Sequence, residues 1–171
     1  FFYPFEPLAF TIKNIKIEII EQYVKATAKK RKTVFACLIN IMTQEIQVKN
    51  KIYMGGCHAV VVLIDLRGLK AQWTIDFYDS GGAPPEHDIA VLLEKLIDFL
   101  QTLKKPTHVN NVKIITASER IIHQETDTEC GMHSLIFIRR RLEGITPSVF
   151  SSLEKIPDDF ATNFRKFVYS N

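Results

Sequence analysis

Residues 124–134, Gln-Glu-Thr-Asp-Thr-Glu-Cys-Gly-Met-His-Ser, place a cysteine where a polar loop turns into an apolar helix. The run Leu-Ile-Phe-Ile at 135–138 continues this helix and predicts that it is buried. Cys130 would then sit in the first turn, where the helix N–H groups and the helix dipole favour a thiolate. An isolated cysteine is more often a small buried hydrophobe, but this position predicts a nucleophile.

A histidine and an aspartate stand at the ends of two predicted strands upstream. His58 opens an apolar strand over 58–66, and Asp79 closes the next, predicted over 72–78. An antiparallel hairpin would bring these two residues together although 21 positions separate them. Asp79 shares a strand face with Phe77, whereas the rival carboxylate Asp76 falls on the other face. The pattern favours His58 as base and Asp79 as its orienting carboxylate, although each type at a strand end is often structural.

Gln124 lies six residues before Cys130. Its amide can donate two hydrogen bonds and could reach a developing oxyanion, with the Cys130 N–H as a second donor. A glutamine alone is an ordinary surface residue. Its position relative to Cys130 makes it a candidate oxyanion donor.

The composition fits a single globular domain over residues 1–171. Apolar residues make up 46% of the chain, and the formal net charge of +3 does not favour a general nucleic-acid binder. Three cysteines without a paired framework suggest a reducing intracellular compartment, the cytoplasm or nucleus or, for a viral protein, the host cytoplasm or virion. No apolar run approaches the roughly 20 residues that cross a bilayer, so no membrane association is expected. Because the chain starts at Phe1 and not at methionine, we expect a processed product or an excised domain.

The pattern along the chain predicts an α+β fold with a central mixed β-sheet flanked by helices. The aromatic and proline-rich start should form an extended arm over residues 1–13, the core should span about 34–145, and C-terminal helices are expected within 147–168. The Gly55-Gly56 pair is expected to break the strand pattern. Further short strands are predicted over 34–39, 45–49 and 112–116, and further helices over 14–32, 89–100 and 130–143.

In this order and spacing, His58, the strand end at 77–80, Gln124 and the Glu-Cys-Gly run at 129–131 closely resemble the SUMO protease family. Adenovirus-type maturation proteases are relatives of that family. The resemblance runs from about residue 56 to 142. It implies a papain-like fold, a triad of His58, Asp79 and Cys130, Gln124 as oxyanion donor, no cofactor, and cleavage after glycine in Gly-Gly-X or Gly-X sites.

Two positions depart from the family pattern. The family commonly has tryptophan after the histidine and aspartate before the cysteine, whereas this chain has Ala59 and Glu129. The tryptophan helps to narrow the channel for the substrate's glycines, and Trp73 on the partner strand is a partial replacement to consider. The tail over 156–165 is similar to that of processing proteases of large DNA viruses, of the poxvirus and African swine fever virus kind. The expected partner is therefore either a viral polyprotein or a ubiquitin-like precursor or conjugate.

Three other functions compete with peptide cleavage. A zinc site could draw on soft ligands, but neighbouring Cys57 and His58 would point to opposite faces of a strand, so no metal is expected. An acyltransferase resembling the Yop-type acetyltransferase effectors would reuse the cysteine, although those usually carry glutamate where this chain has Asp79. An inactive relative would use the groove for peptide binding alone.

Overall fold

The protein is described here from a computed structural model. The structure describes residues 10–11, 17–18, 20–22, 25, 34–48, 51–67, 73–103, 113–116, 122–124, 128–153 and 155–169. Most of the predicted N-terminal arm and of the predicted helix over 14–32 lies outside these residues. Residues 17–18, 20–22 and 25 of that stretch are helical.

Five strands form one mixed sheet in the order β1-β2-β3-β4-β5. The pairs β1–β2 and β4–β5 are parallel, and β2–β3 and β3–β4 are antiparallel. The described strands are β1 (Phe10–Thr11), β2 (Val34–Val48), β3 (Lys51–Asp65), β4 (Thr74–Asp79) and β5 (Lys113–Thr116). The predicted central mixed sheet is confirmed.

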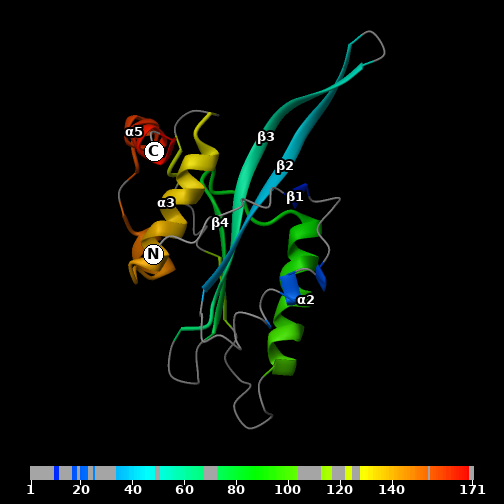
Figure 1. The fold of residues 1–171 in the computed structure, drawn as a ribbon, viewed down its shortest axis with the longest axis vertical. Helices are drawn as coiled ribbons and strands as arrows, with labels where there is room; N and C mark the ends of the chain where they lie inside the picture. The colour runs from blue at the N-terminus through cyan, green and yellow to red at the C-terminus, as the bar shows by residue number, and fades with distance from the viewer. Residues whose placement is uncertain are drawn as a thin grey trace.

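The hairpin of β2 and β3 is longer than expected, and it extends beyond the rest of the sheet (Figure 1). The strands predicted over 34–39 and 45–49 are parts of the single strand β2, and the Gly55-Gly56 pair does not interrupt β3. Glycine weakens a strand but does not stop a partner strand from pairing with its backbone, and Gly55 pairs with Gln44. The prediction that His58 opens a strand was therefore wrong, because His58 lies inside β3.

Helices cover both faces of the sheet, α2 (His87–Leu103) on one and α3 (Cys130–Leu142) on the other (Figure 1). Alternate residues of β3 divide between two apolar clusters, as the period of two in a strand requires. Val60, Val62 and Ile64 face the cluster that includes the buried side of α2, whereas Val61 and Leu63 face α3. A strand buried on both faces explains the continuous apolar run at 59–64.

The helix α3 begins at Cys130, as predicted, and its end is marked by Gly144 at φ 96°. A left-handed residue just after a helix is the usual place for glycine. Two helices follow, α4 (Pro147–Ser151) and α5 (Asp158–Tyr169), and α5 packs on α3. Among the described residues, no helix is both long and apolar enough to span a bilayer.

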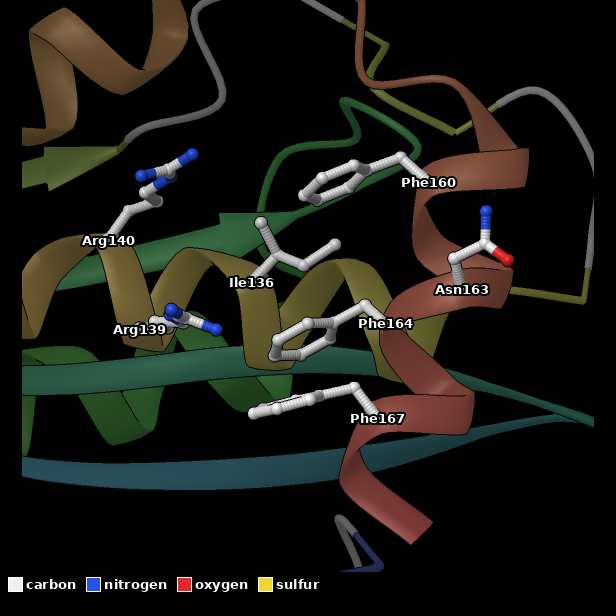
Figure 2. Close-up of a pocket in the computed structure, with 7 residues that line it drawn as sticks. All are labelled: Ile136, Arg139, Arg140, Phe160, Asn163, Phe164 and Phe167. Atoms are coloured by element: carbon white, nitrogen blue, oxygen red, sulfur yellow. The ribbon is translucent and has the colours of Figure 1, made fainter. Parts of the chain in front are cut away.

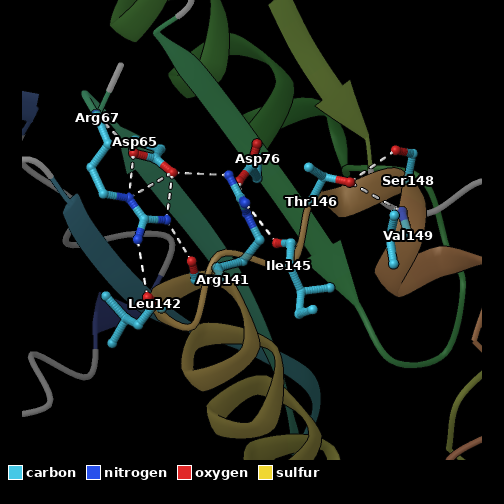
Figure 3. A network of polar contacts seen from close by, with 9 residues as sticks. All are labelled: Asp65, Arg67, Asp76, Arg141, Leu142, Ile145, Thr146, Ser148 and Val149. Atoms are coloured by element: carbon cyan, nitrogen blue, oxygen red, sulfur yellow. Dashed lines mark hydrogen bonds and ion pairs between the residues drawn. The ribbon is translucent and has the colours of Figure 1, made fainter.

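A buried network of charges joins the C-terminal end of α3 to the sheet (Figure 3). The Arg141 guanidinium donates to Asp76 Oδ2 at 2.7 Å and to Asp65 Oδ2 at 3.1 Å, and its side chain is only 6% exposed. Arg67 also binds Asp65 and donates to the carbonyl oxygens of Arg141 and Leu142. The last turn of α3 is thereby held against β3 and β4.

Arg141→Met is expected to lower the free energy of unfolding by about 3–5 kcal/mol, because it removes the arginine that binds the buried Asp76 and leaves Asp65 with Arg67. Arg140→Met is the matched control, since Arg140 is exposed and pairs with Glu143 within the same helix. Its expected change is within about 1 kcal/mol. Urea denaturation followed by circular dichroism measures both, and equal losses would contradict a role for the buried network.

Candidate active site

The register of β3 and β4 brings His58 and Asp79 together. Val60 is the residue opposite Asp79, so His58 lies two positions before that pairing in β3 and on the same face. That diagonal spacing is within reach of an imidazole and a carboxylate, and His58 Nε2 lies 2.7 Å from Asp79 Oδ1. Pairing with β4 begins at Val60, so His58 stands just beyond the end of β4 although it lies inside β3.

Asp79 is itself held by the turn that follows β4. Its Oδ1 accepts a hydrogen bond from the Gly81 N–H at 2.6 Å, and its backbone carbonyl accepts one from Gly82 at 3.1 Å. A Cβ at Gly81 would lie 3.2 Å from Asp79 Oδ1 and 4.0 Å from His58 Cε1, so the turn passes close to the pair. One carboxylate oxygen therefore both caps the turn and contacts the imidazole.

The rival carboxylate Asp76 has a different place. It is fully buried on the α3 side and is bound by Arg141, in accord with the opposite face expected from its parity. Burial raises the pKa of Asp76, although the charge and hydrogen bond of Arg141 act in the other direction. Asp76 belongs to the network at the far end of α3.

Cys130 occupies the first position of α3 and is 8% exposed. Burial by itself would raise the pKa of its thiol. The hydrogen bond with His58, the N–H of Ala59, the charge of His58 and the N–H of Gly131 together outweigh burial and lower that pKa below its ordinary value of 9.0. The sequence predicted that the N-terminus of a helix would favour the thiolate. The structure adds two further contacts that lower the pKa of Cys130, the imidazole of His58 and the N–H of Ala59 in β3.

The backbone of Ala59 connects β3 to α3. Its N–H is directed to the Cys130 sulfur, and its carbonyl oxygen accepts a hydrogen bond from Ser134 Oγ at 3.2 Å. Ser134 is fully buried one turn after the cysteine. The first turn of the helix is therefore held against the residue that follows His58.

The His58 ring bridges the carboxylate and the thiol. The hydrogen bond to Asp79 and then that to Cys130 raise its pKa to about 10, against the opposing effect of burial. Because Asp79 occupies Nε2, Nδ1 is the ring nitrogen that remains for the sulfur. A raised imidazole pKa beside a lowered thiol pKa favours an imidazolium–thiolate pair.

Gln124 is oriented by Ser80, the residue after Asp79. Ser80 Oγ donates to Gln124 Oε1 at 2.6 Å, and the Ser80 carbonyl accepts from the N–H groups of His123 and Gln124 at 3.0 and 3.2 Å. With the amide oxygen held by Ser80, the NH₂ end of Gln124 points away from that hydroxyl. The neighbour His123 is buried against Tyr78 and Phe150, which anchors this segment.

The remaining cysteines and His133 lie outside the candidate active site or outside the described residues. Cys37 is buried in the core, and burial raises its pKa to about 12. The side chain of Cys57 lies outside the described part of the chain. His133 Nε2 faces Asp158 Oδ1 at 3.2 Å, and no cluster of three His, Cys, Asp or Glu side chains suited to a metal occurs among the described residues.

A separate apolar groove lies between α3 and α5 (Figure 2). Phe160, Phe164 and Phe167 of α5 face Ile136 and Arg139 of α3 there. This groove contains neither His58 nor Cys130. It is therefore distinct from the candidate active site.

Comparison with known proteins identifies the fold and the family. The sequence model described as "Ulp1 protease family, C-terminal catalytic domain" matches residues 17–171. The chain belongs to the Ulp1 protease family. This confirms the predicted resemblance to SUMO proteases and the α+β fold class, and the family is one of cysteine peptidases.

African swine fever virus encodes proteins that are similar to this chain. A protein of African swine fever virus named "SUMO-1 cysteine protease S273R" is 31% identical over 150 residues, which cover 86% of this chain and 48% of the relative. A crystal structure of the protease from the same virus superposes with a TM-score of 0.61 at 29% identity, over 78% of this chain and 43% of that one. The chain spans about half the length of the relatives it matches.

The structure corrects one prediction about this Ulp1-family site and adds residues to it. Trp73 precedes β4 and packs on the cluster beside α2. It lies at the Asp65 end of the β3–β4 pair, roughly 17 Å along the strands from Val60. Trp73 therefore does not replace the tryptophan that the family commonly has where this chain has Ala59. Ser80 and Gly81, which orient Gln124 and Asp79, were not predicted. Both residues directly follow Asp79 in the sequence, and this was the signal that could have indicated their roles.

Cys130 should react with iodoacetamide much faster than Cys37 at pH 7, because its pKa is lowered whereas burial raises that of Cys37. Peptide mapping by mass spectrometry after brief labelling measures the selectivity. Cys37→Ala should label at the rate of the unmodified protein, and Cys130→Ala should lose the fast phase. Equal labelling of both thiols would contradict the contrast.

Asp79→Asn should raise the apparent pKa for alkylation of Cys130 by about one unit, because a neutral amide no longer sustains the imidazolium that stabilises the thiolate. Alkylation below that pKa would then slow by about tenfold. The rate measured from pH 5 to 10 tests this. Asp88→Asn removes the same charge from an exposed position of α2 and should leave the profile unchanged, and an unchanged profile in Asp79→Asn would contradict the coupling.

Proposed function

We propose that this domain is a cysteine endopeptidase in which Cys130 is the nucleophile, His58 the base and Asp79 the residue that orients the imidazole. The contact that carries the proposal is the continuous path from Asp79 Oδ1 through the His58 ring to the thiol at the start of α3. The lowered pKa of Cys130 and the raised pKa of His58 support the same roles.

The reaction follows from these positions. The Cys130 thiolate attacks the peptide carbonyl carbon, and the oxyanion accepts hydrogen bonds from the Gln124 amide and from the backbone N–H of Cys130. His58 gives its proton to the departing amine, which leaves an acyl-enzyme thioester. Water, deprotonated by His58, then attacks the thioester. The product leaves as a carboxylic acid that ionises in water, and the imidazolium–thiolate pair is restored.

The substrate we propose is a protein cut after glycine, at a Gly-Gly-X or Gly-X site. Two sources share this chemistry, a viral polyprotein and a SUMO-like or ubiquitin-like precursor or conjugate. The name of the African swine fever virus relative supports a SUMO-type site. The family usually has tryptophan where this chain has Ala59, beside His58. We therefore propose a substrate channel for the glycines that is wider than the family's usual one.

A reducing intracellular compartment suits this chemistry, because the reaction needs an unoxidised thiol. Neither Cys37 nor Cys130 takes part in a disulfide within the described part of the chain. No cofactor enters the proposed mechanism.

Cys130→Ala should abolish cleavage of peptides that contain a Gly-Gly-X site, and Gln124→Ala should slow it by roughly 10²–10³ because one oxyanion donor is lost. Steady-state assays with a fluorogenic peptide and with SUMO and ubiquitin precursors provide the measurement. Gln101→Ala, at an exposed position of α2, and Cys37→Ala are the matched controls and should retain activity. Full activity in His58→Ala would overturn the assignment.

A Gly-Gly vinyl-sulfone probe separates the competing functions. Labelling that disappears in Cys130→Ala supports an active thiolate, whereas tight peptide binding without labelling or cleavage would support a recognition module. Turnover of acetyl-coenzyme A with no peptide cleavage would instead establish an acyltransferase.

A further inference from the structure

The C-terminal helix α5 contacts the turn that leads into Cys130. Arg165 Nη2 lies 3.1 Å from Glu129 Oε2 and donates to the Thr128 carbonyl at 3.2 Å. Thr162 Oγ1, one helical turn earlier, lies 3.4 Å from Glu129 Oε1. Residues more than 30 positions later in the chain therefore hold the two residues before the candidate nucleophile.

Glu129 occupies the position before the helix but does not cap it. Its side chain makes no capping hydrogen bond to α3, and its carboxylate turns toward α5 instead. The residue is buried, with its side chain 8% exposed. Arg165 supplies an opposite charge to this buried carboxylate.

A carboxylate next to a thiol opposes its ionisation, because two like charges in a poorly solvated site repel each other. The first turn of α3 and the imidazole of His58 favour a thiolate at Cys130, and an uncompensated Glu129 would act against both. The arginine is half-exposed, so solvent screens part of its effect. Its contact with Thr128 adds a geometric constraint that screening does not weaken.

We propose that Arg165 is a positioning residue for Cys130. Arg165 cancels the charge of Glu129, the residue before the cysteine, and ties the Cys130 turn to α5. This inference rests on the proposed function of Cys130. The family usually has aspartate at position 129. In this chain the longer glutamate contacts Arg165 and Thr162 of α5.

The other charged and titratable groups near this turn come from three directions. From the sheet, His58 is hydrogen-bonded to Cys130, and Asp79 is bonded to His58. His133 lies within α3. Asp158 of α5 faces His133. Substituting Arg165 leaves all of these side chains in place. A shift in the pH profile of the Cys130 thiol therefore reports on the Arg165–Glu129 pair.

Arg165→Gln should raise the apparent pKa for alkylation of Cys130 by about half a unit to one unit, which slows alkylation at pH 6 by about three- to tenfold. Iodoacetamide labelling of Cys130 followed by mass spectrometry measures this without any substrate. Glu129→Gln/Arg165→Gln removes both charges and should return the profile toward that of the unmodified protein. Arg165→Lys should keep most of the unmodified profile.

Lys166→Gln is the matched control, because it removes a charge from the next, exposed position of α5. Its profile should not move. Thermal unfolding of each variant checks that the fold is retained. If Arg165 served the packing of α5 alone, the double variant would stay as impaired as Arg165→Gln with an unshifted pH profile, and that result would overturn the inference.

The two proposals fail in distinguishable ways. If the unmodified protein shows a Cys130 profile no different from that of a free thiol and cleaves no peptide, the proposed function fails. If the unmodified protein reacts as expected but Arg165→Gln has the same profile, the role of Arg165 fails while the proposed function stands.

Discussion

The antiparallel register between β3 and β4 is the constraint on which the candidate site depends. With Val60 opposite Asp79, His58 falls on the same face as the carboxylate and two positions beyond the end of β4. A shift of one residue would move every side chain of β4 to the other face, which would turn Asp79 toward α3 and take Ile75 and Phe77 out of the cluster beside α2. The same burial that stabilises the sheet therefore selects the pairing of the imidazole with its carboxylate.

The helix α3 transmits that register to the thiol because it is held to the sheet at both ends. Near its N-terminus, Ser134 binds the carbonyl of Ala59. Near its C-terminus, Arg141 binds Asp65 and Asp76 of the same two strands that carry the site. Cys130 therefore reaches the imidazole through a rigid element, whose position the core and a buried charge network determine together.

The environment of the site shows a division of roles among neighbours in sequence. Asp79 contacts His58, and Ser80 orients Gln124. Gly81, which has no side chain, lets the turn pass close to Asp79 and His58. Three consecutive residues thus contact the proposed base, orient the predicted oxyanion donor and shape the turn after β4. On the opposite side, α5 supplies the counter-charge for the residue before the thiol.

The sequence by itself determined the fold class, the helix that begins at Cys130 and the choice of Asp79 over Asp76, because periodicity and parity are local properties of the chain. It also indicated His58, Gln124 and the protease family from residue types at given spacings. It did not reveal the length of β2 and β3, since glycines weaken a local strand signal that partner strands can override.

Only the tertiary structure decided which distant groups meet. Ser134 with Ala59, Arg141 with Asp65 and Asp76, and Arg165 with Glu129 are each joined across 36 to 76 positions or across separate elements. No local pattern encodes such contacts, because they arise when α3 and α5 pack against a sheet whose register is already established.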